Sequence, residues 1–254
     1  MLVTAAAATV LAAAEEAPRP QAPRINIGGI VNAASNRPAP DNYLAPGAIF
    51  SIYGTGLSDG GRTGNTSISS NGILPESLDR MWVLFGAAYA PLFYVSPTQL
   101  NAQVPAFLQP GTWEVRVVVD QLVASEKVVV REYSPGLFGG ARHTDGRLVD
   151  RDAPARPGEY ILFFGTGFGP TRPVMQTGYP ARELAPMTSP VEARIGEVML
   201  QPEDIYYAGL AWDFAGLYQF NLRVPATAPS GDLEVTIKAG QEWSQAGMRI
   251  AVQR

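Results

Sequence analysis

The sequence predicts an all-β protein that contains two copies of one β-sandwich. Three observations support this fold class: short strand-like runs follow one another, turn-forming residues separate them, and two sequence blocks recur in the same order. Glycine and proline contribute 26 and 22 of the 254 residues, which is natural for a β-protein with many tight turns. Helical periodicity is hard to find after residue 25.

The strand-like runs are rich in β-branched and aromatic residues and are bounded by Gly, Pro, Asn, Asp and Ser, which is typical of sandwiches and barrels. In chain order they read AIFSIYG, MWVLFG, APLFYV, WEVRVVV, KVVVREY, EYILFFG, VEARIG, YQFNLRVP, LEVTIKAG and MRIAVQ. In WEVRVVVD, Trp113 and valines at every second position alternate with mostly polar residues. This strand is therefore expected to bury one face and to expose the other.

Two sequence blocks occur twice. Residues 45–60 (APGAIFSIYGTGLSDG) match residues 156–171 (RPGEYILFFGTGFGPT) without a gap. Residues 98–117 match residues 218–237 in the same way, with shared Gln, Asn, Val-Pro, Gly and Glu-Val positions. Blocks that recur in one order indicate two copies of one fold.

The repeats divide the chain into three parts. Residues 1–25 form an export segment with a proline-rich lead-in, and the two copies occupy residues 26–132 and 133–254. Each copy, at about 105–120 residues, has the size of an immunoglobulin-like sandwich. We expect the copies to pack end to end through a short junction near residues 133–140.

Each copy carries a strand that ends in Gly-Thr-Gly, at residues 54–56 and 165–167. This spacing is similar to the start of a dinucleotide-binding loop. Such a loop needs a helix after it and a third glycine three residues on, whereas polar, glycine-rich or proline-rich segments follow here. The motif therefore predicts a tight turn that requires positive φ, and it predicts no cofactor.

Many ordered blocks carry a family resemblance, from about residue 27 to the C-terminus. They read GGIVNAASN, APGAIFSIYGTGL, APLFYVSPTQLNAQVP, SPGLFGG, DGRLVDRDAPARPGEYILFFGTGFGPT, AGLAWDFAGLYQFNLRVP and MRIAVQR. The chain resembles the uncharacterised C-terminal module of secreted proteins first noted in Solibacter, and each half resembles TIG/IPT immunoglobulin-like domains through the I-x-G-T-G-L strand and turn. The resemblance implies two tandem TIG/IPT-like β-sandwich domains in an exported protein, and it brings no known activity and no catalytic residues.

The amino-acid composition excludes or disfavours several kinds of functional site. The chain has no cysteine, which excludes disulfides, thiolate metal sites and cysteine nucleophiles. His143 is the one histidine, so a Ser-His-Asp triad would have a single possible base. The net charge of −4, without any Lys/Arg-rich run, argues against nucleic-acid binding. Hydrophobic residues make up 46%, which is enough to build cores without disulfides.

The N-terminus is typical of an export signal. Residues 2–14 are uncharged and apolar, which is too short to span a bilayer. Ala12 and Ala14 precede an acidic pair and fit an A-x-A cleavage site. A basic n-region is missing, so an alanine-rich tail is the alternative. No later apolar run is long enough to cross a membrane, and the predicted location is periplasmic, cell-surface or extracellular.

A loop between the copies, GGARHTDGRLVDRDAPARPG, concentrates titratable residues. His143, oriented by a neighbouring aspartate, could act as a general base. No G-x-S-x-G motif supplies a nucleophile for it. We therefore predict that the protein is not an enzyme. The three aspartates of the loop, Asp145, Asp150 and Asp152, are the candidate calcium ligands. The alternative is that arginines of the same loop neutralise them: Arg147, Arg151 and Arg156.

Aromatic residues cluster in EDIYYAGLAWDFAGLYQF. Aromatic side chains combine a flat apolar face with a polar tip and bind sugar faces in many β-sandwich modules. The candidate ligand-binding residues are Trp212, which lies in a glycine-flanked turn, and Tyr206 and Tyr207. Strand alternation sends some of these aromatics into the core, so core and inter-domain packing is the alternative.

Two amide side chains recur in both copies, Gln99 and Asn101 in the first and Gln219 and Asn221 in the second. Strand alternation places the members of each pair on one face. Their recurrence favours a structural role, in which the amides bond loop backbone groups. A ligand site is the alternative.

Together these features predict an exported, non-enzymatic binding or adhesion module that recognises a glycan or a protein at or outside the cell envelope. The alternative is a structural or assembly subunit of a cell-surface polymer that self-associates through exposed strand edges. A compact exposed aromatic patch favours the first function, and a long uncovered edge strand favours the second.

Overall fold

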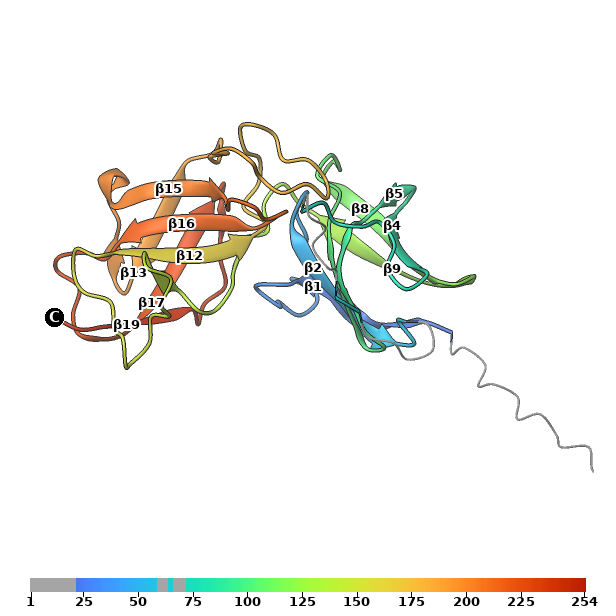
Figure 1. Ribbon diagram of the computed structural model, residues 1–254, viewed down its shortest axis with the longest axis horizontal. Coiled ribbons are helices and arrows are strands. Elements are labelled where there is room, and N and C mark those ends of the chain that lie inside the picture. Colours follow the sequence, from blue (N-terminus) through green and yellow to red (C-terminus); the bar gives the residue numbers. More distant parts are fainter. Residues whose placement is uncertain (1–21, 59–63, 66–71) are drawn as a thin grey trace, which may run out of the picture.

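The computed structural model describes residues 22–58, 64–65 and 72–254, so the predicted export segment lies almost wholly outside the described residues. Within the described part the chain forms strands and turns, with a short 3-10 helix at Pro202–Asp204 and no α-helix. The strands build two β-sandwiches that lie side by side along the long axis of the molecule (Figure 1). The prediction of two tandem immunoglobulin-like β-sandwiches is confirmed.

The first sandwich, drawn in blue to green in Figure 1, packs two antiparallel sheets against each other. The strands of one sheet are, in spatial order, β1 (Arg24–Asn32), β2 (Ile49–Thr55), β7 (Gln99–Gln103), β6 (Leu92–Val95) and β3 (Gly64–Asn65). Those of the other are β5 (Ala88–Tyr89), β4 (Met81–Phe85), β8 (Gly111–Val119) and β9 (Leu122–Val130).

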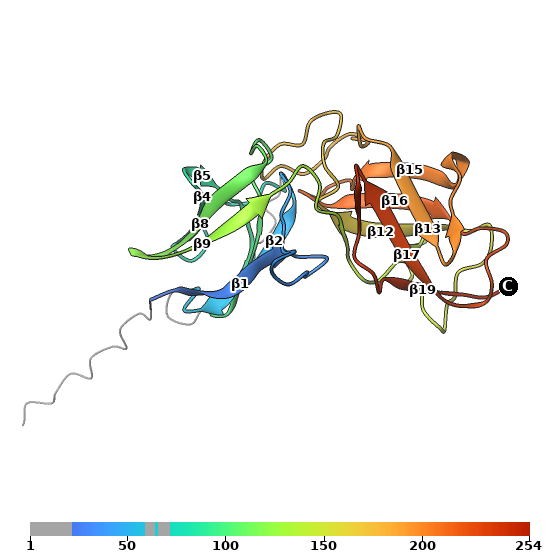
Figure 2. The same ribbon diagram turned by 180° about the vertical axis from the view of Figure 1, so that it is seen from behind.

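The second sandwich repeats this arrangement, and its two sheets are seen from both sides in Figures 1 and 2. One sheet contains β10 (Gly136–Leu137), β12 (Tyr160–Thr166), β16 (Tyr218–Arg223) and β15 (Ile205–Leu210), and β11 (Arg142–His143) also pairs with β12. The other contains β14 (Val198–Met199), β13 (Val191–Ile195), β17 (Gly231–Ala239), β18 (Glu242–Trp243) and β19 (Arg249–Val252), the last of which pairs with β17.

The sequence repeats fall on equivalent strands. The first block becomes β2 in one sandwich and β12 in the other, and the second block becomes β7 and β8 in one and β16 and β17 in the other. The registers agree as well, because Ile52 opposes Leu100 in the first copy while Phe163 opposes Phe220 in the second. The repeat therefore encodes strand pairing as well as strand position.

Each sandwich has its own apolar core between its sheets. In the first, the largest fully buried side chains include Phe50, Phe85, Leu44, Ile52, Met81 and Leu92. In the second they include Tyr218, Phe163, Phe168 and Phe220. The inward positions alternate along the strands, as in β4 and β16, so the period-2 pattern directs one face of each strand into its own core.

Each Gly-Thr-Gly motif ends a strand, and its second glycine has the positive φ that was predicted. Gly56 and Gly167 adopt φ values of 64° and 80°, which side chains with a Cβ disfavour. A Cβ on Gly167 would lie 2.2 Å from the carbonyl oxygen of Ser134. In the second copy no helix follows the motif, so this position lacks the geometry of a dinucleotide-binding loop.

Ser134, in the connector between the sandwiches, bonds to both of them. Its N–H donates to Gly167 O at 2.9 Å, and its hydroxyl donates to Tyr43 O at 2.7 Å. Its own carbonyl accepts from Asn32 Nδ2 at 2.7 Å. The connector is therefore fixed by hydrogen bonds rather than free to swing.

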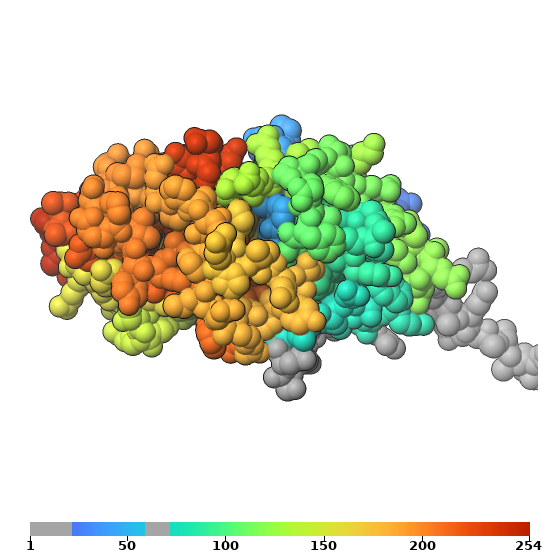
Figure 3. Space-filling view, turned by 90° about the horizontal axis from the view of Figure 1, so that it is seen from above, coloured from blue at the N-terminus to red at the C-terminus, as the bar shows by residue number. Residues whose placement is uncertain are grey.

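A long loop of the second sandwich, residues 167–190 between β12 and β13, reaches across to the first sandwich; we call it the junction loop. Gly178 N–H donates to the buried side-chain oxygen Oε1 of Gln103 at 2.6 Å. Thr177 Oγ1 accepts the N–H of Ala106 at 2.8 Å. Figure 3 shows this loop, in yellow-orange, lying against the green surface of the first sandwich. The loop thus joins the two sandwiches and contributes to the hollows described below.

Candidate functional site

The three aromatic residues predicted to bind a ligand lie around one cleft on the second sandwich. Its volume is about 400 Å³. Tyr206 and Tyr207 come from β15, Trp212 comes from the turn that follows, and Gln219 and Asn221 come from β16. Residues separated by fifteen positions meet because β15 and β16 are antiparallel neighbours. We call this hollow the aromatic cleft.

Two of these aromatic side chains are largely exposed, although large apolar side chains are usually buried. Tyr206 is 77% exposed and Trp212 is 58% exposed. The ring of Tyr206 rests edge-on against Tyr160, with centroids 5.8 Å apart. Tyr207 is partly buried, and its hydroxyl donates to the carbonyl of Leu210 at 2.8 Å. Burial raises the pKa of this phenol above its ordinary value.

The turn that carries Trp212 is fastened to the junction loop. Asp213 has a φ of 65°, a left-handed conformation that aspartate adopts more readily than most residues. Its N–H donates to Ala181 O at 3.0 Å, and Ala181 N–H donates to Phe214 O at 3.4 Å. Arg182 also pairs with the Asp213 carboxylate. These contacts hold the backbone of the turn against the junction loop, and the turn places Trp212 at the cleft.

The recurring amides form the polar side of the cleft. Gln219 Nε2 donates to Asn221 Oδ1 at 2.8 Å, and Gln99 donates to Asn101 in the first sandwich at 2.9 Å. The prediction that each pair shares a face is confirmed. The expected bonds from these amides to loop backbone are wrong, because within each copy the two amides bond to each other.

The amide pair of the cleft keeps unused bonding capacity. Among the described residues, Gln219 Oε1, Asn221 Nδ2 and the indole N–H of Trp212 have no hydrogen-bond partner. They offer acceptors and donors toward the same hollow. The cleft therefore combines flat apolar faces with groups that can donate hydrogen bonds to hydroxyls and accept hydrogen bonds from them.

Three residues that line the cleft were missed from the sequence: Glu183, Leu184 and Leu210, the last residue of β15. Glu183 and Leu184 belong to the junction loop and line the cleft together with the residues of β15 and β16. Leu184 is 71% exposed. An isolated Glu-Leu in a proline-rich loop carries no periodic signal, so only the fold brings these side chains to the cleft.

The side chains of two of the three candidate calcium ligands, Asp145 and Asp150, are engaged in other interactions. Asp145 Oδ2 accepts from Arg147 Nε at 2.7 Å. Hydrogen bonds from Arg147 backbone and side chain lower the pKa of this carboxyl. Asp150 Oδ1 accepts the backbone N–H of Asp152 and of Ala153, at 2.9 and 2.8 Å. Across the described residues, no three His, Cys, Asp or Glu side chains gather in a group that suits a metal ion.

Of the arginines expected to neutralise these aspartates, only Arg147 does so in the described contacts. Arg151 instead pairs with Asp232 of β17 at 3.0 Å. Asp152 is exposed and lines a hollow beside His143. Calcium binding by Asp145, Asp150 and Asp152 stays a prediction, and the structure brings together Asp145 with Arg147 rather than the three carboxylates.

His143 is buried, at 6% exposure, and both ring nitrogens face acceptors. Nδ1 lies 2.5 Å from Glu159 Oε1 and Nε2 lies 2.9 Å from Ala153 O. The partner of Nδ1 is Glu159, directly before β12, rather than one of the aspartates of the loop. With both nitrogens occupied, the imidazole has no nitrogen left to activate a serine.

No helix in the described residues is long and apolar enough to cross a membrane. No family model matches the chain, and no curated protein matches it. The resemblance to the Solibacter-type module therefore stays a prediction, whereas the immunoglobulin-like architecture rests on the sheets themselves.

Solved structures with distant similarity contain several immunoglobulin-like or surface proteins. One is SGBP-B of the Bacteroides ovatus mixed-linkage glucan utilization locus in complex with a mixed-linkage heptasaccharide, with 13% identity, a TM-score of 0.35 and coverage of 84% of this chain and 45% of that one. Another is the plexin A4 extracellular region, with 12% identity, a TM-score of 0.32 and coverage of 94% of this chain and 19% of that one. A third is the BSP domain of a biofilm associated protein, with 11% identity, a TM-score of 0.27 and coverage of 92% of this chain and 29% of that one.

The chain thus spans less than half the length of these three structures. Identities of 11–13% and TM-scores of 0.35 or lower are too low to transfer a ligand or an activity. The functional argument therefore rests on the cleft.

Proposed function

We propose that this protein is an exported, non-enzymatic binding module of the Solibacter-type family, and that the aromatic cleft binds a glycan. Export rests on the apolar segment before residue 15 and its A-x-A pattern. Glycan binding rests on the cleft, and the absence of enzymatic activity rests on the sequence and on the occupied ring of His143. The three parts are independent and are tested separately.

The observation that carries glycan binding is the meeting of two unrelated sequence features in one cleft. Exposed aromatic side chains, Tyr206 and Trp212, stand beside an amide pair, Gln219 and Asn221, with open hydrogen-bonding capacity. A pyranose ring has C–H faces that pack on an aromatic plane and hydroxyls around its edge that both donate and accept. The cleft offers both kinds of partner within one hollow.

The shape of the site favours a sugar over a folded protein partner. A hollow of about 400 Å³ lies in the size range of small-ligand sites. A stable protein interface buries about 800 Å² on each partner and is centred on a broad patch. The Trp212 turn is already fixed by its bonds to Ala181, so little ordering entropy opposes binding of a small rigid ligand.

A glycan array probed with the folded protein, followed by isothermal titration calorimetry on the positive glycans, tests the site. Trp212→Ala is expected to weaken binding about 30-fold, which corresponds to about 2 kcal/mol for loss of a central aromatic contact. Tyr89→Ala is the matched control, because Tyr89 is a 43% exposed aromatic on the first sandwich. The control is expected to leave the affinity unchanged.

Two results would contradict the proposed site. An array without a bound glycan would remove glycan binding itself. Equal losses for Trp212→Ala and Tyr89→Ala would show that sugars are bound without the aromatic cleft.

One observation favours the second candidate function, assembly through strand edges. β9 lies at the edge of its sheet, and Val123 on it is 55% exposed. Leu44 covers the far end of this edge by bonding to residues 129 and 131. Charged Glu126 and Lys127 lie in the middle of the strand, which opposes pairing with a second chain.

Assembly is tested by light scattering after size-exclusion chromatography of the full chain. A monomer at all concentrations would remove this candidate. A discrete oligomer that Val123→Lys dissolves would support it, and it would leave the aromatic cleft to be judged by the array.

A further inference from the structure

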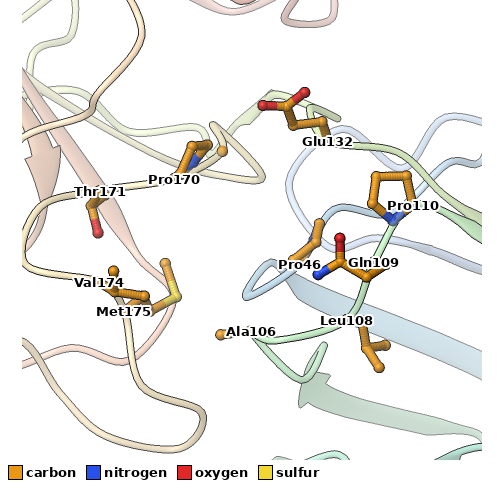
Figure 4. A pocket seen from close by; sticks show the side chains of 11 residues that line it. Pro46, Ala106, Leu108, Gln109, Pro110, Glu132, Pro170, Thr171, Val174 and Met175 are labelled. Carbon is orange, nitrogen blue, oxygen red and sulfur yellow. The ribbon is translucent and has the colours of Figure 1, made fainter.

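A second hollow lies between the two sandwiches, separate from the aromatic cleft. Its volume is about 380 Å³. Figure 4 shows its walls: residues of the first sandwich on one side, the junction loop on the other, and Glu132 of the connector above them. The view from above in Figure 3 shows a depression at this place, between the yellow-orange junction loop and the green strands. We call it the junction pocket.

The walls of the junction pocket are largely apolar. The first sandwich supplies Pro46, Ala106, Leu108, Gln109 and Pro110, and the junction loop supplies Gly169, Pro170, Thr171, Val174 and Met175. Val174 is 78% exposed at its rim. Prolines and branched aliphatic side chains hold their shape because they have few rotamers. The pocket surface therefore suits a rigid apolar ligand better than a hydrated polar ligand.

Hydrogen bonds between the first sandwich and the junction loop fix the distance between the walls of the pocket. Gln103 donates to Gly47 O at 3.1 Å and accepts from Gly178 N at 2.6 Å, so one buried side chain bridges the two sandwiches. Ala106 N–H reaches Thr177 Oγ1 at 2.8 Å. These bonds keep the pocket open in the free protein, which lowers the entropy lost on binding.

The charged group in the lining is the carboxylate of Glu132. In the described part of the chain, no ion pair involves this side chain. Its neighbour Arg131 instead stacks on Tyr43, with its guanidinium carbon 3.3 Å from the ring centroid, and pairs with Glu242 at 3.4 Å. Glu132 is exposed, and its carboxylate also interacts with the side chain of Tyr133. It therefore presents a negative charge beside an apolar pocket, without a cationic partner among the described residues.

We propose that the junction pocket binds a small ligand with an apolar body and a single amine or other cationic group. The apolar body fills the space between Leu108, Val174 and Met175, and the cation pairs with Glu132. A carboxylate beside an apolar wall attracts a cation more strongly than one in bulk water, since the wall excludes solvent on one side. The same charge repels an anionic ligand of equal shape.

A matched pair of probes tests this charge preference: 4-phenylbutylamine and 4-phenylbutyric acid, which share an apolar body and differ in charge. Binding is followed by NMR on protein carrying ¹³C-methyl methionine, because Met175 lines the pocket. Met81 and Met248 lie in the two cores and serve as internal references. The Met175 signal is identified by Met175→Leu.

The amine is expected to shift the Met175 signal and to bind at least about tenfold more tightly than the acid. Glu132→Gln is expected to remove this preference while leaving the apolar contacts in place. Val174→Lys, at an exposed position, is expected to weaken amine binding about tenfold by placing a like charge at the rim. Trp212→Ala is expected to change neither probe, which separates this pocket from glycan binding.

Three results would overturn the proposal. The Met175 signal could stay fixed while the amine is titrated to millimolar concentration. The acid could bind as tightly as the amine. Glu132→Gln could leave the ratio of the two affinities unchanged, which would show that the carboxylate does not recognise the ligand.

Discussion

At the scale of single residues, His143 is a buried imidazole between two acceptors. Glu159 Oε1 and Ala153 O face its two nitrogens, and a neutral imidazole can donate from only one of them. The hydrogen bond that the imidazole donates to the Glu159 carboxylate raises the pKa of His143 above the ordinary value of 6.5, against the opposing effects of burial and Arg147. The protonated ring is therefore the form that the folded protein stabilises.

This arrangement predicts a pH dependence of stability. Because the pKa is raised on folding, the stabilisation is fully present below about pH 6.5 and is lost as pH rises through the folded-state pKa. The melting temperature of the protein is expected to fall over this window. His143→Gln is expected to remove the slope, because this is the one histidine of the chain.

Glu159→Gln provides the control for the cause of the shift. It removes the charge that holds the proton and is expected to move the fall in stability to lower pH. A wild-type protein whose melting temperature stays flat between pH 6 and 9 would show that folding does not raise the pKa of His143.

At the scale of elements, a glycine in a turn can be required by φ alone or by φ together with close packing. Gly167 and Gly146 both have positive φ, at 80° and 88°. A Cβ at Gly167 would lie 2.2 Å from Ser134 O, whereas a Cβ at Gly146 meets nothing within 4 Å. The pair separates backbone strain from steric collision.

Gly146→Ala is expected to cost about 1 kcal/mol of unfolding free energy, which is the strain of a left-handed alanine. Gly167→Ala is expected to cost more than about 3 kcal/mol, since it also displaces the connector at Ser134. Urea unfolding of both variants measures the difference. Equal losses would show that the turn after β12 relaxes freely and does not anchor the connector.

The strands and loops differ in how well the sequence alone predicts them. The repeat predicted β2, β7, β8 and their partners in the second copy, because alternation and turn glycines are local signals. It predicted the aromatic side of the cleft for the same reason, since Trp212 sits in a glycine-flanked turn. The junction loop escaped prediction. Its path is set by distant bonds such as Gly178 to Gln103, and these leave no periodic pattern.

At the scale of the whole molecule, the two copies share a fold but differ where they meet. Thr55 and Thr166 occupy the same place in the Gly-Thr-Gly motif, yet Thr55 is exposed and Thr166 is fully buried. Thr166 Oγ1 accepts from Ile49 N–H at 2.8 Å and donates to Gly216 O at 2.7 Å. The repeat therefore became asymmetric by using one copy of the motif as an inter-domain contact.

Gln103 shows the same asymmetry with a larger consequence. The matching residue in the second copy is Arg223, which pairs with Asp204 at 2.7 Å on its own sandwich. Gln103 instead donates to Gly47 within its own sandwich and accepts from Gly178 across the junction. The relative placement of the sandwiches, and with it the junction pocket, depends on this one buried amide.

Gln103→Leu is expected to loosen the junction, because it leaves the buried Gly178 N–H and Gly47 carbonyl without their partner, at a cost of about 3 kcal/mol. Amide hydrogen exchange at Gly178 is then expected to accelerate about 100-fold. Gln99→Leu, in the same strand, removes only a bond to Asn101 and is expected to leave Gly178 protected. If Gly178 exchanges at the wild-type rate in Gln103→Leu, other contacts hold the junction loop in place. If both variants accelerate it equally, the strand rather than the buried amide joins the two sandwiches.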